Sequence, residues 1–196
     1  MDYFNLVKSR RSIRKYKAQP VERRDILKIL DAANWAPSAM NWQPWEFIVV
    51  SGAWLKQLGD SYKNAVKKFS QKLYEEDVSK VISNDDFIKF SAVYGGAPVA
   101  IVVLARINHD VPDERKANLE SACAAMQNLI LAAAALGLGT CWMTSPLGDE
   151  AHLRRILSIP DDREIVAITP LGYPDADPKP LPRMDPELKE KVKWLE

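Results

Sequence analysis

Residues 116–136 read KANLESACAAMQNLILAAAAL, a stretch that is apolar on nearly every side when it is wound as a helix. Two polar pairs, Glu120-Ser121 and Gln127-Asn128, interrupt the run, which falls short of the ~20 apolar residues that a bilayer requires. We therefore expect a helix enclosed within the protein rather than a membrane span. In a chain of 196 residues, a second subunit is one way to complete that enclosure.

Outward from this helix, the periodicity of apolar residues predicts alternating helices and strands. Residues 98–105, PVAIVVLA, are typical of a strand buried on both faces. Further strands are expected over 46–51, 140–144 and 164–171, and further helices over 2–8, 21–36, 53–83, 149–157 and 187–195. Residues 84–96 break the helical pattern and 175–186 form a proline-rich connection. This order favours a single mixed α/β sandwich domain over residues 1–196.

Composition excludes several classes of function. The 27 basic and 26 acidic residues nearly cancel, which argues against nucleic acid or an anionic membrane as a partner. Cys123 and Cys141 lack metal-ligand spacing and are expected to be free thiols of a cytoplasmic protein, with Cys123 as a nucleophile the weaker alternative. His109 and His152 are isolated, so no metal site is expected. Charge from Asp2 onward predicts no signal peptide.

A basic cluster, SRRSIRKY, occupies residues 9–16. Guanidinium groups present planar forks of donors that fit phosphate oxygens. In an extended segment side chains alternate, so Arg10, Ser12 and Arg14 point one way while Arg11 and Ile13 point the other. The cluster predicts a site for one dianion. A solvated surface or a contact with nucleic acid would be rich in the same residue types.

A second informative stretch, WAPSAMNWQPW, covers residues 35–45 between an expected helix and an expected strand. Its tryptophans lie beside hydrogen-bonding groups on Ser38, Asn41 and Gln43, a mixture that suits a flat heteroaromatic ligand. The alternative is a helix-ending turn whose tryptophans pack into the core. Loops held by a rigid frame often carry binding residues.

Five motifs, taken in order, resemble the FMN-dependent nitroreductase family over nearly the whole chain, with residues 54–97 poorly covered. They are RRSIRKY (10–16), APSAMNWQPW (36–45), GLGTCWMTSP (137–146), LGYP (171–174) and the pair Pro182-Arg183. The resemblance implies an α+β fold, in which a mostly antiparallel sheet flanked by helices forms a three-layer sandwich. It also implies an intertwined homodimer with FMN at the subunit interface.

The resemblance further implies roles for particular residues. Arg10 and Ser12 hold the FMN phosphate together with Arg183, Arg11 adds backbone contacts, and Arg14 reaches the pyrimidine edge of the ring. Lys179 is a candidate second cation for the phosphate.

The remaining residues implied by the resemblance surround the flavin ring. Pro37, Ser38 and Ala39 close over it from the partner subunit, with Asn41 near the mouth of the site. Met143, Thr144 and Ser145 lie along the ring, and either Thr144 or Ser145 contacts N5.

The implied activity is an FMN-dependent NAD(P)H oxidoreductase that reduces nitroaromatic, quinone or similar acceptors by ping-pong hydride transfer through N5, using NADH or NADPH. The flavin carries the chemistry, so no protein nucleophile is required. The alternatives are a non-catalytic flavin-binding or redox-sensing module and a specialised dehalogenase, flavin-fragmenting enzyme or dehydrogenase. Deiodinases of this superfamily carry Glu and Tyr four residues apart in a lid. Residues 54–97, the expected substrate lid, lack that pair. The residues four positions before the tyrosines at 62, 74 and 94 are Leu58, Ser70 and Phe90, and none of them is acidic.

Overall fold

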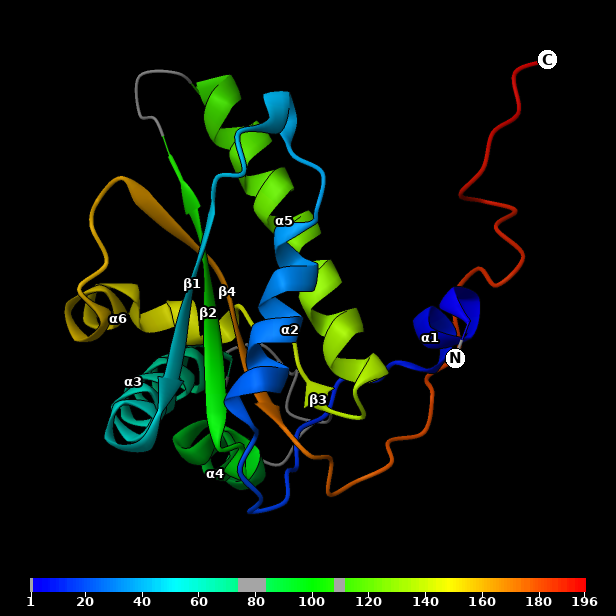
Figure 1. The fold of residues 1–196 in the computed structure, drawn as a ribbon. Helices are drawn as coiled ribbons and strands as arrows, with labels where there is room; N and C mark the ends of the chain where they lie inside the picture. The colour runs from blue at the N-terminus through cyan, green and yellow to red at the C-terminus, as the bar shows by residue number, and fades with distance from the viewer. Residues whose placement is uncertain (1, 74–83, 108–111) are drawn as a thin grey trace.

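The computed structural model describes residues 2–73, 84–107 and 112–196 (Figure 1). These residues form the helices α1 (Tyr3–Ser9), α2 (Arg23–Asn34), α3 (Gly52–Leu73), α4 (Asn84–Val93), α5 (Pro112–Ala135) and α6 (Glu150–Leu157). They form the strands β1 (Trp45–Ser51), β2 (Val99–Arg106), β3 (Gly139–Thr140) and β4 (Arg163–Gly172). Short 3-10 turns lie at Ala39–Asn41 (η1), Tyr94–Gly96 (η2) and Ser145–Asp149 (η3).

The described strands make one antiparallel sheet in the order β1-β2-β4-β3. Strand β2 lies in the interior of the sheet, where Val102 pairs with Ile48 on one side and with Ile168 on the other. Every residue of β2 except Arg106 is buried. The expectation of a strand covered on both faces is therefore confirmed.

Helices cover both faces of the sheet, as Figure 1 shows, with α2 and α5 on one face and α3, α4 and α6 on the other. Alternate residues of β2 enter the two cores, because successive side chains of a strand point to opposite faces. Ile101 and Val103 belong to the core under α2 and α5, whereas Val102 and Leu104 belong to the core under α3 and α6. The chain is thus an α+β three-layer sandwich, as the sequence analysis expects.

Helix α5 is enclosed along most of its length. Its buried residues include Ala122, Met126, Leu129 and Ala133, all fully inaccessible to solvent. The polar residues that interrupt its apolar run find partners, since Asn128 Nδ2 donates a 3.1 Å hydrogen bond to a carbonyl of α2. Within the described ranges, none of the helices combines the length and apolar character that a membrane span needs.

The expectation that residues 84–96 break the helical pattern is wrong, because residues 84–93 form α4. Helix α4 packs closely against α3: a Cβ added at Gly59 would lie 2.0 Å from the carbonyl oxygen of Ala92. Phe87 and Phe90 of α4 make edge contacts with the ring of Tyr62, at centroid distances of 6.1 and 6.2 Å. Tertiary packing therefore stabilises a helix whose own periodicity is weak.

Two further expectations differ from the structure. Residues 187–195 form turns rather than a closing helix, and they are exposed, so no packed face supports a helix there. The strand expected over 140–144 is reduced to β3, after which Met143 forms only an isolated bridge with Ile168. The end of the helix expected over 53–83 lies outside the described residues.

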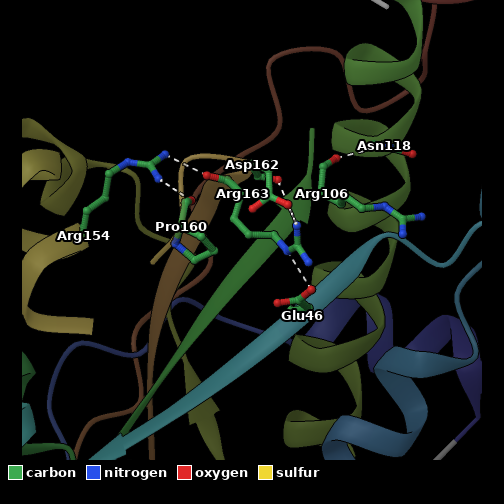
Figure 2. A network of polar contacts seen from close by, with 7 residues as sticks. All are labelled: Glu46, Arg106, Asn118, Arg154, Pro160, Asp162 and Arg163. Carbon is green, nitrogen blue, oxygen red and sulfur yellow. Dashed lines mark hydrogen bonds and ion pairs between the residues drawn. The ribbon is translucent and has the colours of Figure 1, made fainter. Parts of the chain in front are cut away.

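A polar network fastens the end of the sheet farthest from β3 (Figure 2). Arg163 of β4 reaches across β2, and its Nε donates a 2.6 Å hydrogen bond to Oε1 of Glu46 on β1. Arg154 of α6 donates to the carbonyl of Arg163, and Asn118 of α5 donates to the carbonyl of Arg106. This end of the sandwich is therefore closed by structural contacts.

Candidate functional site

Residues 10–16, here called the arginine segment, run along the other end of the sheet. The amide of Ile13 donates a 2.8 Å hydrogen bond to the carbonyl of Thr140, and the amide of Tyr16 donates a 3.0 Å bond to the carbonyl of Gly95. An extended segment leaves its amides and carbonyls available for such pairing. The segment is thus fastened to both the β3 region and the η2 turn.

Two glycines allow this close approach. A Cβ at Gly139 would lie 2.8 Å from Cβ of Ile13, a distance that forces something to move. A Cβ at Gly95 would lie 2.2 Å from the carbonyl oxygen of Arg14, and Gly95 also has a φ of +67°, which favours glycine. The backbone around the arginine segment therefore has no room for larger residues.

Arg10, Ser12 and Arg14 all act on one buried thiol, that of Cys141. Burial raises the pKa of Cys141, while the charge of Arg14, a hydrogen bond from Ser12 and the charge of Arg10 oppose that rise. Ser12 therefore bonds to the sulfur, and the two arginines act on it through their charge.

Arg11 points elsewhere. Its Nη1 donates hydrogen bonds of 2.7 and 2.8 Å to the carbonyls of Lys8 and Arg10. The Arg11 guanidinium thus stabilises the turn between α1 and the arginine segment, and its side chain is occupied by the protein's own backbone.

Among the described residues, the two cations that flank Ser12 have no anionic partner. Within residues 2–73, 84–107 and 112–196, no carboxylate forms an ion pair with Arg10 or Arg14. The neighbouring Lys15, in contrast, pairs with Asp175 at 3.2 Å. Unpaired guanidinium groups beside a hydroxyl are suited to an anion from outside the chain.

A cavity of about 210 Å³ opens beside Arg10. It is lined by Arg10 and Arg11, by Ala134 near the end of α5, and by residues 176–178 of the segment that follows β4. The N-terminal cations and the C-terminal segment therefore meet at one hollow, although they lie at opposite ends of the chain.

The η3 turn carries further sequence-predicted residues. The hydroxyl of Tyr62, on α3, lies 2.8 Å from Oγ of Ser145. Burial raises the pKa of Tyr62, while the hydrogen bond with Ser145 and the charge of Arg14 oppose that rise. Thr144 and Ser145 are exposed. Met143 is instead buried, and its amide and carbonyl both bond to Ile168.

Asp149 fastens the far end of η3 to α3. Its carboxylate accepts hydrogen bonds from Lys68 at 3.0 Å and Ser61 at 3.3 Å, and lies 3.3 Å from Nδ1 of His152. Burial alone would raise the pKa of Asp149, but the bonds and charge of Lys68, with His152 and Ser61, hold it below its ordinary value. The turn carrying Ser145 is therefore anchored at both ends.

Residues 35–45, here called the tryptophan loop, are strained. Met40, Asn41 and Gln43 have φ values of 49°, 57° and 46°, in a region that side chains other than glycine rarely adopt. Such strain persists only where surrounding contacts enforce it, and it is common at functional sites.

Hydrogen bonds maintain this conformation. The Ser38 hydroxyl accepts a 3.0 Å bond from the amide of Gln43, and the amide of Ala39 donates a 3.2 Å bond to Oγ of Ser121 on α5. Trp35 and Met40 are 78% and 81% exposed, so the expectation of tryptophans buried in the core does not hold for Trp35.

Within one chain the tryptophan loop is distant from the arginine segment. Ser121 contacts the loop, and Ala134 lines the cavity beside Arg10. These two residues are thirteen positions apart in α5, which is about 20 Å along a helix that rises ~1.5 Å per residue. One subunit therefore does not close its own tryptophan loop over its own arginines.

Of the sequence-predicted residues, Arg10 lines the cavity, Ser12 bonds to Cys141, and Ser145 lies on η3 beside Tyr62. Arg183 and Lys179 lie exposed on the segment after β4, which Figure 1 shows running past α1 and away from the sheet. Residues 176–178 of that segment line the cavity, and Lys179 and Arg183 come after them in the chain.

Sequence reasoning missed two residues of the site. Cys141 lies inside the GLGTCWMTSP motif but is predicted only as a free thiol, and the fold is needed to show that Ser12 bonds to it. Tyr62 lies in a stretch rich in Lys and Glu, where no motif marks it. Tyr62 can be recognised only from its position on the buried face of α3, which requires the tertiary structure.

Comparison with known proteins agrees with this arrangement. The model of the nitroreductase family matches residues 7–173. A Methanothermobacter thermautotrophicus protein, provisionally named an NADH dehydrogenase/NAD(P)H nitroreductase, is 34% identical over 99% of this chain and 88% of its own. A Thermotoga neapolitana iodotyrosine deiodinase is 30% identical over 90% of each chain.

A solved structure is also similar. The FMN-dependent nitroreductase of Clostridium difficile R20291 superposes with a TM-score of 0.72 and 28% identity, covering 98% of this chain and 99% of that one. Because the family match spans most of the sequence and the fold agrees throughout, this chain belongs to the nitroreductase family.

Proposed function

We propose that this oxidoreductase is an FMN-dependent NAD(P)H oxidoreductase that reduces nitroaromatic, quinone or similar acceptors by a ping-pong cycle. One observation carries the proposal: Arg10 lines a cavity, Ser12 and Arg14 follow it on the same extended segment, and within the described residues neither arginine is ion-paired. This donor set fits a group with a dianionic tail and a polar ring edge, which is the chemistry of FMN. The similarity to an FMN-dependent nitroreductase supports the same cofactor.

At the phosphate end, Arg10 and Ser12 offer charged and neutral donors from one side of the arginine segment. Arg11 contributes backbone contacts, since its guanidinium bonds to the carbonyls of Lys8 and Arg10. Arg183 adds a further cation when the C-terminal segment folds over the cavity, and Lys179 is a candidate for the same role.

At the ring end, Arg14 lies at the pyrimidine edge near N1 and O2, and Thr144 or Ser145 lies at N5. Bound FMN would supply the redox chemistry, namely hydride transfer between reduced nicotinamide and the acceptor. The Arg14 cation stabilises the negative charge that reduction places near N1 and O2. Met143 lies along the ring through its backbone, because its side chain is buried.

The site requires a second copy of the chain. The tryptophan loop, with Pro37, Ser38, Ala39 and Asn41, lies about 20 Å along α5 from the cavity of its own subunit. A homodimer brings the partner's loop to the flavin. Exposed apolar side chains that such an interface would cover include Phe4, Met40, Leu181, Met184 and Trp194. Sedimentation equilibrium should give twice the chain mass, and a monomer with full flavin content would contradict the shared site.

The cofactor proposal has a direct test. The purified protein should be yellow, and NADH or NADPH should bleach it without oxygen. With menadione or a nitrofuran as acceptor, it should oxidise the nicotinamide faster than an equal amount of free FMN. Rates equal to those of free FMN would favour the non-catalytic flavin-binding alternative, and a colourless protein that does not bind added FMN would contradict both.

The two free cysteines favour a reducing, cytoplasmic compartment.

Reductive deiodination is a second candidate, because one relative is named iodotyrosine deiodinase. The acid of the deiodinase lid is absent here: Leu58 and Phe90 stand four positions before Tyr62 and Tyr94. Both tyrosines are also buried, whereas a lid tyrosine has to reach a substrate. Tyr74, the remaining candidate, lies outside the described residues. The preferred acceptor can be tested by comparing two rates for the reduced protein: iodide release from diiodotyrosine and reduction of a nitrofuran.

A further inference from the structure

The contact between α3 and η3 is unusually well defined. Tyr62 is 1% exposed, and its hydroxyl lies 2.8 Å from Oγ of Ser145. Its ring meets those of Phe87, Phe90 and Tyr94 at centroid distances of 6.1, 6.2 and 5.4 Å. An aromatic ring packed on several sides has little freedom to move, so the position of its hydroxyl is fixed.

The direction of this hydrogen bond follows from burial. A phenol carries one hydrogen, and a buried O–H requires an acceptor. Among the described residues, Ser145 is the one hydrogen-bond partner of the Tyr62 hydroxyl. Either oxygen could donate, but if Ser145 donated, the Tyr62 hydrogen would be buried without an acceptor, so burial favours Tyr62 as the donor and Ser145 as the acceptor. Burial also raises the pKa of Tyr62, which keeps the phenol protonated at neutral pH.

The hydrogen of Ser145 itself then remains available. Ser145 is exposed, so its hydroxyl can donate outward to a ligand. A hydroxyl that accepts one hydrogen bond becomes a better donor in the next, because the two bonds polarise each other. Thr144, its neighbour, has no side-chain bond capping η3 and lacks such an anchor.

The anchored hydroxyl is linked to the arginine segment through Tyr62. The charge of Arg14 acts on Tyr62, and Cys141, which bonds to Ser12, acts on it too. Ser145 on η3 contacts the phenol directly, and Arg14 on the arginine segment acts on it through its charge.

We propose that Tyr62 is a positioning residue of the flavin site, which holds the Ser145 hydroxyl as a fixed hydrogen-bond donor toward N5 of FMN. This inference rests on the proposed function and assigns the N5 contact to Ser145 rather than Thr144. Oxidised N5 accepts a hydrogen bond, whereas reduced N5 carries a hydrogen and does not. Loss of the anchor therefore weakens binding of oxidised FMN more than binding of reduced FMN.

Tyr94 offers a matched control. Its hydroxyl is buried and has no hydrogen-bond partner among the described residues, and its ring adjoins that of Tyr62. Tyr94→Phe and Tyr62→Phe thus remove the same atom from the same aromatic cluster, but only the second removes a hydrogen bond to η3.

The experiment uses the full-length, FMN-loaded protein and its variants Tyr62→Phe, Ser145→Ala, Tyr94→Phe and the double variant Tyr62→Phe/Ser145→Ala. Two quantities are measured: the two-electron midpoint potential, and the 15N chemical shift of N5 in labelled FMN. Tyr62→Phe should lower the affinity for oxidised relative to reduced FMN about ten-fold, which raises the potential by about 30 mV. It should also move the N5 resonance.

The remaining variants decide the outcome. Tyr94→Phe should leave both quantities unchanged, and the double variant should match Ser145→Ala alone, because the two residues act in series. If Ser145→Ala changes both quantities and Tyr62→Phe changes neither, the inference is overturned while the proposed function stands. It is also overturned if Ser145→Ala has no effect, or if Tyr94→Phe acts as strongly as Tyr62→Phe. A wild-type protein that binds no FMN would overturn the proposed function itself.

Discussion

The amide of Ile13 lies 2.8 Å from the carbonyl oxygen of Thr140, and this hydrogen bond joins the arginine segment to the end of β3. Ser12 forms a parallel bridge with the same residue. The bond is short because Gly139, the residue before Thr140, leaves space for the side chain of Ile13. The direction of Arg10 and Arg14 therefore depends on a glycine about 125 residues away in the chain.

Gly139→Ala tests this dependence. The added methyl would lie 2.8 Å from Cβ of Ile13, so the arginine segment has to shift. Overpacking of this kind costs about 1–3 kcal/mol of unfolding free energy. We expect a lower urea midpoint together with weaker FMN binding. Unchanged FMN affinity in a destabilised protein would show that the cations do not depend on this contact.

Arg10→Ala should weaken FMN binding. Charge-assisted hydrogen bonds contribute about 1.5–3 kcal/mol, so the dissociation constant should rise by about ten-fold to a hundred-fold. Lys15→Ala is the matched control, because it removes the same charge from an exposed side chain paired with Asp175. An exposed pair contributes at most about 1 kcal/mol, and Lys15 lies on no proposed ligand contact. Equal losses in the two variants, measured by quenching of FMN fluorescence, would indicate only general electrostatic attraction.

Arg14→Ala should make bound flavin harder to reduce. Removal of a fixed cation near N1 and O2 takes away stabilisation of the reduced state, so the midpoint potential falls. Arg14→Lys retains the charge and should recover most of the wild-type potential. A potential that is the same in wild type and Arg14→Ala would place Arg14 away from the pyrimidine edge.

Asp149 should make the free energy of unfolding depend on pH in the acid range. Its native pKa lies below the ordinary value of 3.8, so its contribution is fully present above that value. The contribution is lost as the pH falls through the lower native pKa, because the native carboxylate then takes up a proton. Asp149→Asn should flatten the acid branch of a plot of urea midpoint against pH.

Lys68→Met removes a principal donor to Asp149, so the native pKa of Asp149 rises toward its ordinary value and the loss of stability in acid should become smaller. If wild type and Asp149→Asn have acid branches of equal slope, the carboxylate does not carry this part of the stability. The wild type and both variants should be compared in one urea series at each pH.

Local sequence patterns were sufficient to predict the elements whose residues are buried in a regular pattern. Strand β2 and the C-terminal half of helix α5 are almost entirely apolar, and each lies where the sequence predicts it. Helix α4 could not be predicted, because it is stabilised by the fit of Ala92 against Gly59 and by aromatic contacts to α3. Residues 187–195 have a helical pattern without a surface to pack on, and a short helix in water is marginal without one.

The amino-acid sequence by itself determined which groups are available: guanidinium groups at positions 10 and 14 with a hydroxyl between them, on one side of an extended segment. Spacing along one segment is local, so side-chain alternation is sufficient to predict it. Only the tertiary structure decided what these groups meet. Tyr62 reaches Ser145 across 83 positions of chain, and Ser12 meets Cys141, because three packed layers bring α3, η3 and the arginine segment together. Such contacts depend on the packing of the whole domain, which no local periodicity encodes.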